Sequence, residues 1–314
     1  ALVRLNMLLA LLLCAAPLLA EPPLGEELEA EPLRLGIRGH SVAQHTFSLF
    51  AAPGESLRLD LADYDVDDMR LSLEGKPFGT PRDGFWEVPA PRDPGLYVLS
   101  LENGPLSARM RLNLFVGREL APGQEELNGY LIGPAPPGSV KYPGLYPAPR
   151  LYFEVTEDNV DMPLSDHFTL RQFLCKQESD FPKYLAMKES LLVLLEGLVE
   201  TVREAGYPIQ TFGVISGYRT PWYNRKIGNV PNSRHVYGDA MDFFVDLDGD
   251  DRLDDLDGNG TTDSADVDLL FDIVEQYKRR PENRLLVGGV GRYYATSAHG
   301  GFVHVDARGF RARW

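Results

Sequence analysis

Alternation of apolar and polar residues between about residues 34 and 118 constrains the fold of this 314-residue chain more than any other feature. Three runs have a period of two: Leu57, Leu59, Leu61; Tyr97, Leu99, Leu101; and Met110, Leu112, Leu114, Val116. Successive side chains of a strand point to opposite faces, so each run describes a strand with one buried face. Turn-forming clusters at 52–54 and 92–95 separate the runs. The pattern predicts an all-β, immunoglobulin-like sandwich of antiparallel strands over residues 34–118.

A second domain is expected after a linker. Seven prolines lie between residues 121 and 149, which predicts an extended Pro/Gly-rich linker over residues 119–150. Beyond it, helical and strand-like patterns alternate, which predicts an α+β domain over residues 151–314. We expect helices at 183–205 and 265–279, and strands at 211–216, 239–245 and 302–305.

The beginning of the sequence is typical of an export signal. Arg4 precedes an apolar run from Met7 to Leu19, and a polar segment follows Ala20, so residues 1–20 predict a cleaved signal peptide that contains Cys14. We therefore expect a protein of the bacterial cell envelope, periplasmic or otherwise exported, with no stable membrane span after cleavage. The net charge of -15 argues against a nucleic-acid partner, which needs positive patches.

Three residues of the second domain suggest a metal site. His235 and Asp242 are seven positions apart, and His304 lies in the last predicted strand. Two imidazoles and a carboxylate form a three-ligand site with an open fourth position, which is typical of catalytic zinc. The spacing alone leaves open the alternative that these are ordinary surface residues.

The motifs around these residues resemble those of the M15 metallopeptidases. The similar segments are Ser216-Gly217-Tyr218-Arg219, then Ser-x-His-x-x-Gly-x-Ala-x-Asp at 233–242, and His304-Val305-Asp306. The resemblance covers about residues 160–314. It implies an M15/hedgehog-like α+β fold and zinc bound by His235, Asp242 and His304.

The resemblance also implies a function and two further site residues. The family contains zinc D-Ala-D-Ala carboxypeptidases and murein endopeptidases, so we expect hydrolysis of peptidoglycan stem peptides or cross-links. Arg219 would contact the substrate, since its guanidinium can hold a carboxylate or a carbonyl oxygen. Ser233 would contribute to the substrate site by orienting His235, or would only cap the loop.

The general base is the least determined part of the predicted site. Where several M15 branches carry Glu, this chain has Gly301, and where another branch carries His it has Phe302. His299 is the remaining candidate for the catalytic base. The departure leaves an alternative open, namely a catalytically inactive, metal-binding protein that binds cell wall; a calcium-dependent adhesin is a third possibility.

An acidic insertion at residues 246–268 predicts calcium. It holds ten Asp and one Arg, hence a local charge of -9. One loop of the EF-hand or dockerin type would use Asp255, Asp257, Asn259, Thr261, Asp263 and Asp266 at positions 1, 3, 5, 7, 9 and 12. A second series begins with Asp246, Asp248, Asp250 and Asp254 and would share Asp257. A solvated acidic loop is the alternative.

Overall fold

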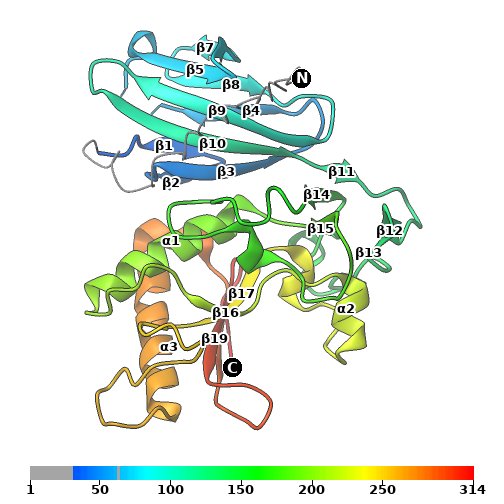
Figure 1. The fold of residues 1–314 in the computed structure, drawn as a ribbon, viewed down its shortest axis with the longest axis vertical. Coiled ribbons are helices and arrows are strands. Elements are labelled where there is room, and N and C mark those ends of the chain that lie inside the picture. Colours follow the sequence, from blue (N-terminus) through cyan, green and yellow to red (C-terminus); the bar gives the residue numbers. More distant parts are fainter. Residues whose placement is uncertain (1–30, 62–63) are drawn as a thin grey trace, which may run out of the picture. The chain divides into compact units, whose positions relative to one another are not determined.

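The computed structural model describes residues 31–61 and 64–314, and the predicted signal peptide lies outside the described residues. The alternating region forms two five-stranded sheets (Figure 1). The first has the order β2-β1-β4-β8-β7, with β1 Leu35–Ile37, β2 His40–Val42, β4 Ser56–Asp60, β7 Thr80–Arg82 and β8 Phe85–Pro89. The second has the order β3-β10-β9-β5-β6, with β3 Thr46–Ala51, β5 Met69–Leu73, β6 Lys76–Pro77, β9 Gly95–Asn103 and β10 Ala108–Val116.

Burial in these strands follows the alternation for most of their length. Leu57 and Leu59 of β4 are buried while Ser56 and Arg58 are exposed. The last five residues of β10 are all buried, because the other face of this strand is also covered: the amide of Asn113 donates to Pro163 O at 2.9 Å. One pair differs from the predicted antiparallel arrangement, since β3 and β10 run parallel.

The Pro/Gly-rich segment after β10 has little regular secondary structure, but it packs against the rest of the described chain. It contains β11 Arg118–Glu119, the hairpin of β12 Glu126–Leu127 and β13 Tyr130–Leu131, and the 3-10 helix η2 Pro143–Leu145. Ile132 is fully buried, and its carbonyl accepts a hydrogen bond from the amide of Trp222 at 2.9 Å. Asn232 exchanges two hydrogen bonds with the backbone of Gly138.

A small sheet precedes the first long helix. Its order is β11-β14-β15, with β14 Leu151–Val155 and β15 Lys183–Leu185. The predicted helix at 183–205 is therefore wrong at its start, and α1 spans Glu189–Glu204. Tyr184 and Leu185 are buried by pairing with β14, which outweighs their helical propensity. From Glu189 on, Leu191, Leu194, Leu195 and Leu198 form the buried stripe of α1.

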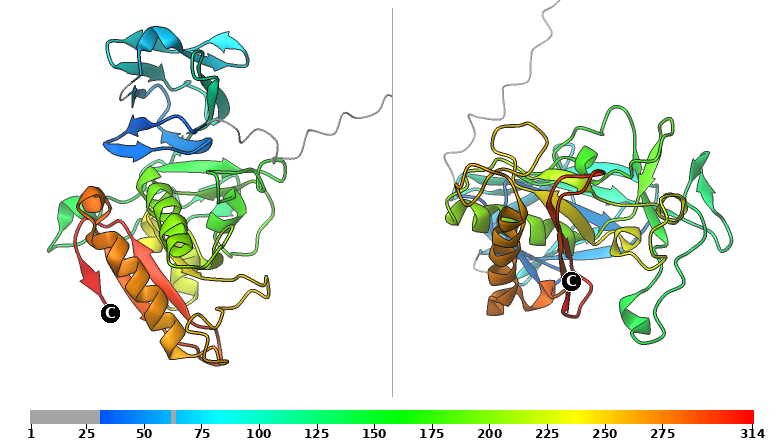
Figure 2. Two further views of the ribbon diagram at one scale, coloured as in Figure 1. Left: turned by 90° about the vertical axis from the view of Figure 1, so that its left-hand side faces the viewer. Right: turned by 90° about the horizontal axis from the view of Figure 1, so that it is seen from below.

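The last sheet carries the predicted site. Its order is β16-β17-β19-β18-β20, with β16 Gly213–Ser216, β17 Ala240–Phe244, β18 Gly289–Tyr293, β19 Phe302–Asp306 and β20 Ala312–Arg313. The other elements are η3 Leu170–Phe173, α2 Pro221–Lys226, η4 Arg234–Tyr237, α3 Ser264–Arg279 and η5 Pro281–Leu286. α3 packs on β18 and β19 and also against α1 (Figure 2). Residues 32–314 cluster into one compact unit.

Candidate metal centre

The register of the last sheet aligns the predicted site residues in one row. Ser216 pairs with Asp242, Asp242 with His304, and His304 with Gly291. Directly opposed residues on neighbouring antiparallel strands have Cβ atoms about 5 Å apart, so their side chains meet on the same face. Asp242 Oδ1 lies 2.7 Å from His304 Nδ1.

His235 joins this pair from the 3-10 helix η4. Gly238 ends η4 with a φ of 70°, a left-handed conformation that leads directly into β17. His235 Nδ1 lies 2.7 Å from Gly217 O, which leaves Nε2 facing Asp242 Oδ2 at 3.1 Å. One ligand atom each of His235, Asp242 and His304 lie within 4.8 Å of one another, and all three residues are buried.

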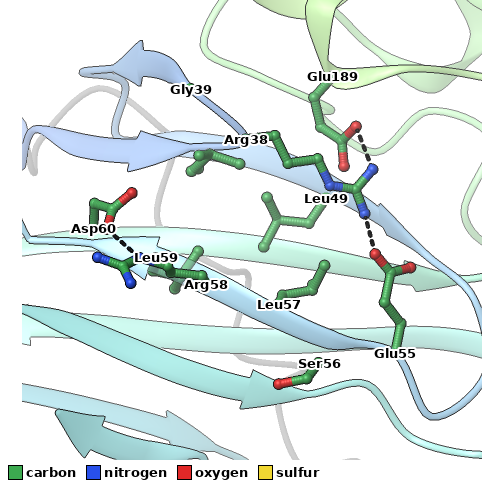
Figure 3. A pocket seen from close by; sticks show the side chains of 11 residues that line it. Arg38, Gly39, Leu49, Glu55, Ser56, Leu57, Arg58, Leu59, Asp60 and Glu189 are labelled. Carbon is green, nitrogen blue, oxygen red and sulfur yellow. Dashed lines mark hydrogen bonds and ion pairs between the residues drawn. The ribbon is translucent and has the colours of Figure 1, made fainter.

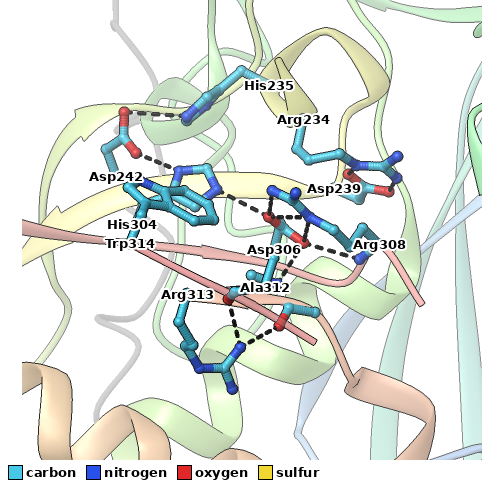
Figure 4. A network of polar contacts seen from close by, with 12 residues as sticks. Arg234, His235, Asp239, Asp242, His304, Asp306, Arg308, Ala312, Arg313 and Trp314 are labelled. Atoms are coloured by element: carbon cyan, nitrogen blue, oxygen red, sulfur yellow. Dashed lines mark hydrogen bonds and ion pairs between the residues drawn. The ribbon is translucent and has the colours of Figure 1, made fainter. Parts of the chain in front are cut away.

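Asp306 fixes the orientation of His304 from the other side (Figure 4). His304 Nε2 lies 3.1 Å from Asp306 Oδ2. The carboxylate of Asp306 also accepts hydrogen bonds from the Arg308 side chain and from Gly289 N, the latter at 2.9 Å. Both imidazoles therefore have an oxygen partner on the nitrogen that faces away from the cluster, as metal-bound histidines usually do.

The electrostatics of the cluster favour the cation-binding form of Asp242 and His235, and the protonated form of His304. Burial acts to raise the pKa of the Asp242 carboxyl, but His235 and His304 outweigh burial and lower that pKa below its usual range. Burial lowers the pKa of His235, which favours the neutral imidazole. For His304, burial is outweighed by hydrogen bonds to Asp242 and Asp306, and its pKa is raised. Metal binding there would release a proton. The donor set and the converging geometry fit a zinc ion.

Arg219 and Ser233 lie beside the cluster in different ways. The Arg219 guanidinium is buried, donating to Ser216 Oγ at 2.7 Å and to Asp242 Oδ2 at 2.8 Å. It therefore contacts a predicted metal ligand. Ser233 is the N-cap residue of η4 and makes no side-chain capping bond, and the group that orients His235 is the Gly217 carbonyl.

His299 lies outside the three-residue cluster. It sits in the loop between β18 and β19, half-exposed, with Nδ1 2.8 Å from Gly300 O. Its ring contacts the Phe302 ring edge to face, with 5.1 Å between centroids. Phe302 lies two residues before His304 on the same face of β19.

The acidic insertion forms two clusters instead of one shared series. Carboxylates of Asp246, Asp248 and Asp250 converge in the first cluster, and those of Asp255, Asp257 and Asp266 converge in the second. Asp257, which we expected both series to share, belongs to the second alone. Asp254 belongs to neither cluster and accepts a hydrogen bond from Leu247 N at 2.5 Å.

The two acidic loops have the same backbone hydrogen bonds and a similar backbone conformation at equivalent positions. Gly249 N donates to Asp246 Oδ1 at 2.8 Å, and Gly258 N donates to Asp255 Oδ1 at the same distance. The sixth position of each loop has a positive φ, 62° at Asp251 and 91° at Gly260. The remaining predicted calcium ligands form hydrogen bonds with residues close in sequence. Thr261 Oγ1 donates to Asn259 Oδ1, and the Asp263 side chain caps the N-terminus of α3.

Sequence reasoning missed several residues at the centre. Asp306 follows His304 by two positions on one strand, and this period-two spacing could have assigned it as a partner of the imidazole. The sequence also contains a signal for two separate acidic loops, because Asp-Leu-Asp-Gly occurs at 246–249 and again nine residues later at 255–258. No sequence signal pointed to Trp314, whose ring packs beside His304 in the folded chain, or to Tyr293, whose hydroxyl accepts a hydrogen bond from Trp314.

The fold and the cluster together define a mixed α/β domain with a His/His/Asp centre of the catalytic metal type. Residues 166–255 match the family model described as Peptidase M15. This part of the chain is thus similar to the M15 peptidases, a family of zinc-dependent metallopeptidases, and the resemblance predicted from the motifs is confirmed over the matched residues. His235 and Asp242 lie within the matched residues, and His304 lies beyond them. Comparisons with curated proteins and with solved structures gave no match.

Proposed function

We propose that this chain is a zinc-dependent peptidase that hydrolyses peptide bonds of bacterial peptidoglycan. The observation that carries the proposal is the buried convergence of His235, Asp242 and His304 in a domain with an M15 match. A zinc ion held by these residues would polarise the scissile carbonyl and acidify a water molecule. Cleavage at the carboxyl end of a stem peptide and cleavage of a cross-link are both compatible with the site.

The protein's own residues would keep this site in one geometry. Asp306 and the Gly217 carbonyl hold the two imidazoles by their remote nitrogens. Arg219 is paired with Asp242, and a substrate carboxylate or carbonyl that competes for the guanidinium would be held next to the metal ligand. His299 would accept the proton of the attacking water, after a rotation that brings its ring from Gly300 towards the centre. Ser233 would line the substrate site from the start of η4.

Digestion of purified cell wall tests this function. We expect the zinc-loaded protein to release defined muropeptides that mass spectrometry assigns to one type of bond, and His304→Ala to release none. Binding to cell wall without any cleavage would instead favour the alternative, a catalytically inactive binding protein.

We further propose that the loops at 246–254 and 255–266 bind calcium. Each gathers three carboxylates in an order that suits an EF-hand-type loop. The ten Asp of the insertion would repel one another strongly without a cation. Calcium would then order a segment that begins four residues after Asp242.

The remaining proposals concern the whole chain. Two five-stranded sheets with buried inner residues support the predicted immunoglobulin-like sandwich, for which we propose a binding or spacing role. A peptidoglycan substrate lies outside the cytoplasm, so we propose a protein that is periplasmic or otherwise exported. Within residues 31–61 and 64–314, no helix is long and apolar enough to cross a membrane.

A further inference from the structure

A tyrosine on the neighbouring strand lies on the same face of the sheet as the metal ligand His304. Tyr293 of β18 pairs with Phe302 of β19, and it lies two positions from Gly291, the partner of His304. Because side chains alternate along a strand, Tyr293 and His304 point to the same face of the sheet. The Tyr293 and Phe302 rings are stacked in parallel, with centroids 4.6 Å apart and planes at 7°.

Trp314 connects this tyrosine to His304. The indole Nε1 donates a hydrogen bond to the Tyr293 hydroxyl oxygen at 2.7 Å, and the indole ring lies 5.2 Å from the His304 ring. The space for the indole depends on Gly291, where a Cβ atom would lie 2.4 Å from Nε1. The backbone of Trp314 is held on β18 by the bond from Arg292 N to Trp314 O at 3.0 Å.

The direction of this hydrogen bond decides what the phenol can do. An indole N–H can only donate, so the phenolic oxygen is the acceptor and the O–H proton is available for another acceptor. Tyr293 is half-buried and Trp314 is 45% exposed. The pair therefore reaches both His304 and solvent, and a peptide bound at the centre would meet it.

We propose that Tyr293 is a catalytic residue whose hydroxyl donates a hydrogen bond to the oxyanion of the tetrahedral intermediate, and that Trp314 is the positioning residue for it. The inference rests on the proposed peptidase function. As the water oxygen bonds to the carbonyl carbon, the carbonyl π pair moves onto the oxygen and the water proton passes to His299. The C–N bond then breaks, the amine takes that proton, and Tyr293 keeps its own.

The test compares Tyr293→Phe with Tyr294→Phe in the full chain. Tyr294 is an exposed neighbour whose hydroxyl lies 2.9 Å from Asp268, so its variant removes the same atom outside the site. We expect Tyr293→Phe to lower kcat about 10²-fold with KM and zinc content unchanged, as for loss of one oxyanion donor. Gly291→Ala, which displaces the indole, should lower kcat in the same direction, while Tyr294→Phe should match the wild type.

A second readout separates transition-state binding from folding. A phosphinate analogue of the cleaved bond mimics the oxyanion, and Tyr293→Phe should weaken its affinity about as much as it lowers kcat, with unchanged affinity for the cleavage product. If the wild type cleaves cell wall and Tyr293→Phe keeps its kcat within threefold, the role of Tyr293 is wrong and the proposed function stands. If the wild type cleaves nothing, the proposed function fails and this inference fails with it.

Discussion

At the scale of single residues, the carboxylate behind a metal-binding imidazole determines how well the metal is held. Asp306 contacts His304 Nε2 and is itself held by Arg308 and Gly289 N. We expect Asp306→Asn to lower zinc affinity about 10- to 100-fold, because the charge that orients the imidazole and raises its basicity is lost. Competition with a chromophoric chelator measures this affinity.

The controls for that measurement are on the same chain. His304→Ala should abolish stoichiometric zinc binding, and Asp272→Asn, which changes an exposed carboxylate of α3, should bind zinc as the wild type does. Equal zinc affinity in Asp306→Asn and wild type would contradict the orienting role.

His299 is the second residue whose role can be separated from metal binding. We expect His299→Ala to lower turnover about 10²- to 10⁴-fold, the usual cost of losing a positioned acid–base group, with zinc content unchanged. Turnover and metal analysis of the same preparation measure both quantities. A loss of less than about threefold would contradict the role of general base and leave the proton transfer to another group.

At the scale of elements, the two acidic loops should respond to calcium separately. Since Asp257 belongs only to the second cluster, Asp257→Ala should remove one of two binding sites, and Asp248→Ala should remove the other. Isothermal titration should give two calcium ions per wild-type chain and one per variant. Calcium should raise the melting temperature, because a hundredfold excess over Kd adds up to about 2.7 kcal/mol to the free energy of unfolding. Identical melting curves with and without millimolar calcium would contradict the proposal.

Helix α3 carries a buried lysine that links stability to alkaline pH. Burial lowers the pKa of Lys278 from 10.5 to about 8, although its ammonium donates to Leu286 O and Asp306 O. The unfolded chain therefore binds more protons than the folded chain between pH 8 and pH 10.5, and stability should rise with pH in that window. The gain should be on the order of 3 kcal/mol.

Urea unfolding at several alkaline pH values measures this effect against a matched variant. In Lys278→Met, the free energy of unfolding should not increase with pH in this window. The wild type should therefore gain stability relative to this variant as pH increases. Lys226→Met, at an exposed lysine of α2, should keep the rise. Parallel stability curves for wild type and Lys278→Met would show that Lys278 does not titrate in this window.

At the scale of the whole described molecule, one buried carboxylate joins α1 to the first two sheets. Glu189 accepts a hydrogen bond from Phe50 N at 2.9 Å and pairs with Arg38, which also binds Glu55 (Figure 3). Glu189→Ala would leave a buried N–H unsatisfied, and we expect it to lower the free energy of unfolding by about 1–3 kcal/mol.

Because residues 32–314 cluster into one unit, we expect a single calorimetric transition that moves to lower temperature in Glu189→Ala. Glu200→Ala, at an exposed position of the same helix, should shift it little. Two separate transitions, of which only one moves, would show that the sheets and the second domain unfold independently.

The sequence by itself determined the local structure and the chemistry of the donors. Alternation predicted the strands because burial of one face repeats every two residues, and the ordered motifs identified His235, Asp242 and His304 because zinc selects imidazole and carboxylate. Tertiary structure decided what depends on strand register and on contacts distant in sequence. Pairing with β14 turned residues 183–185 into a strand. The pairing of β18 with β19 and with β20 brought Trp314 beside His304 and within hydrogen-bond distance of Tyr293. Such pairings depend on residues far apart in the chain, so local periodicity contains no information about them.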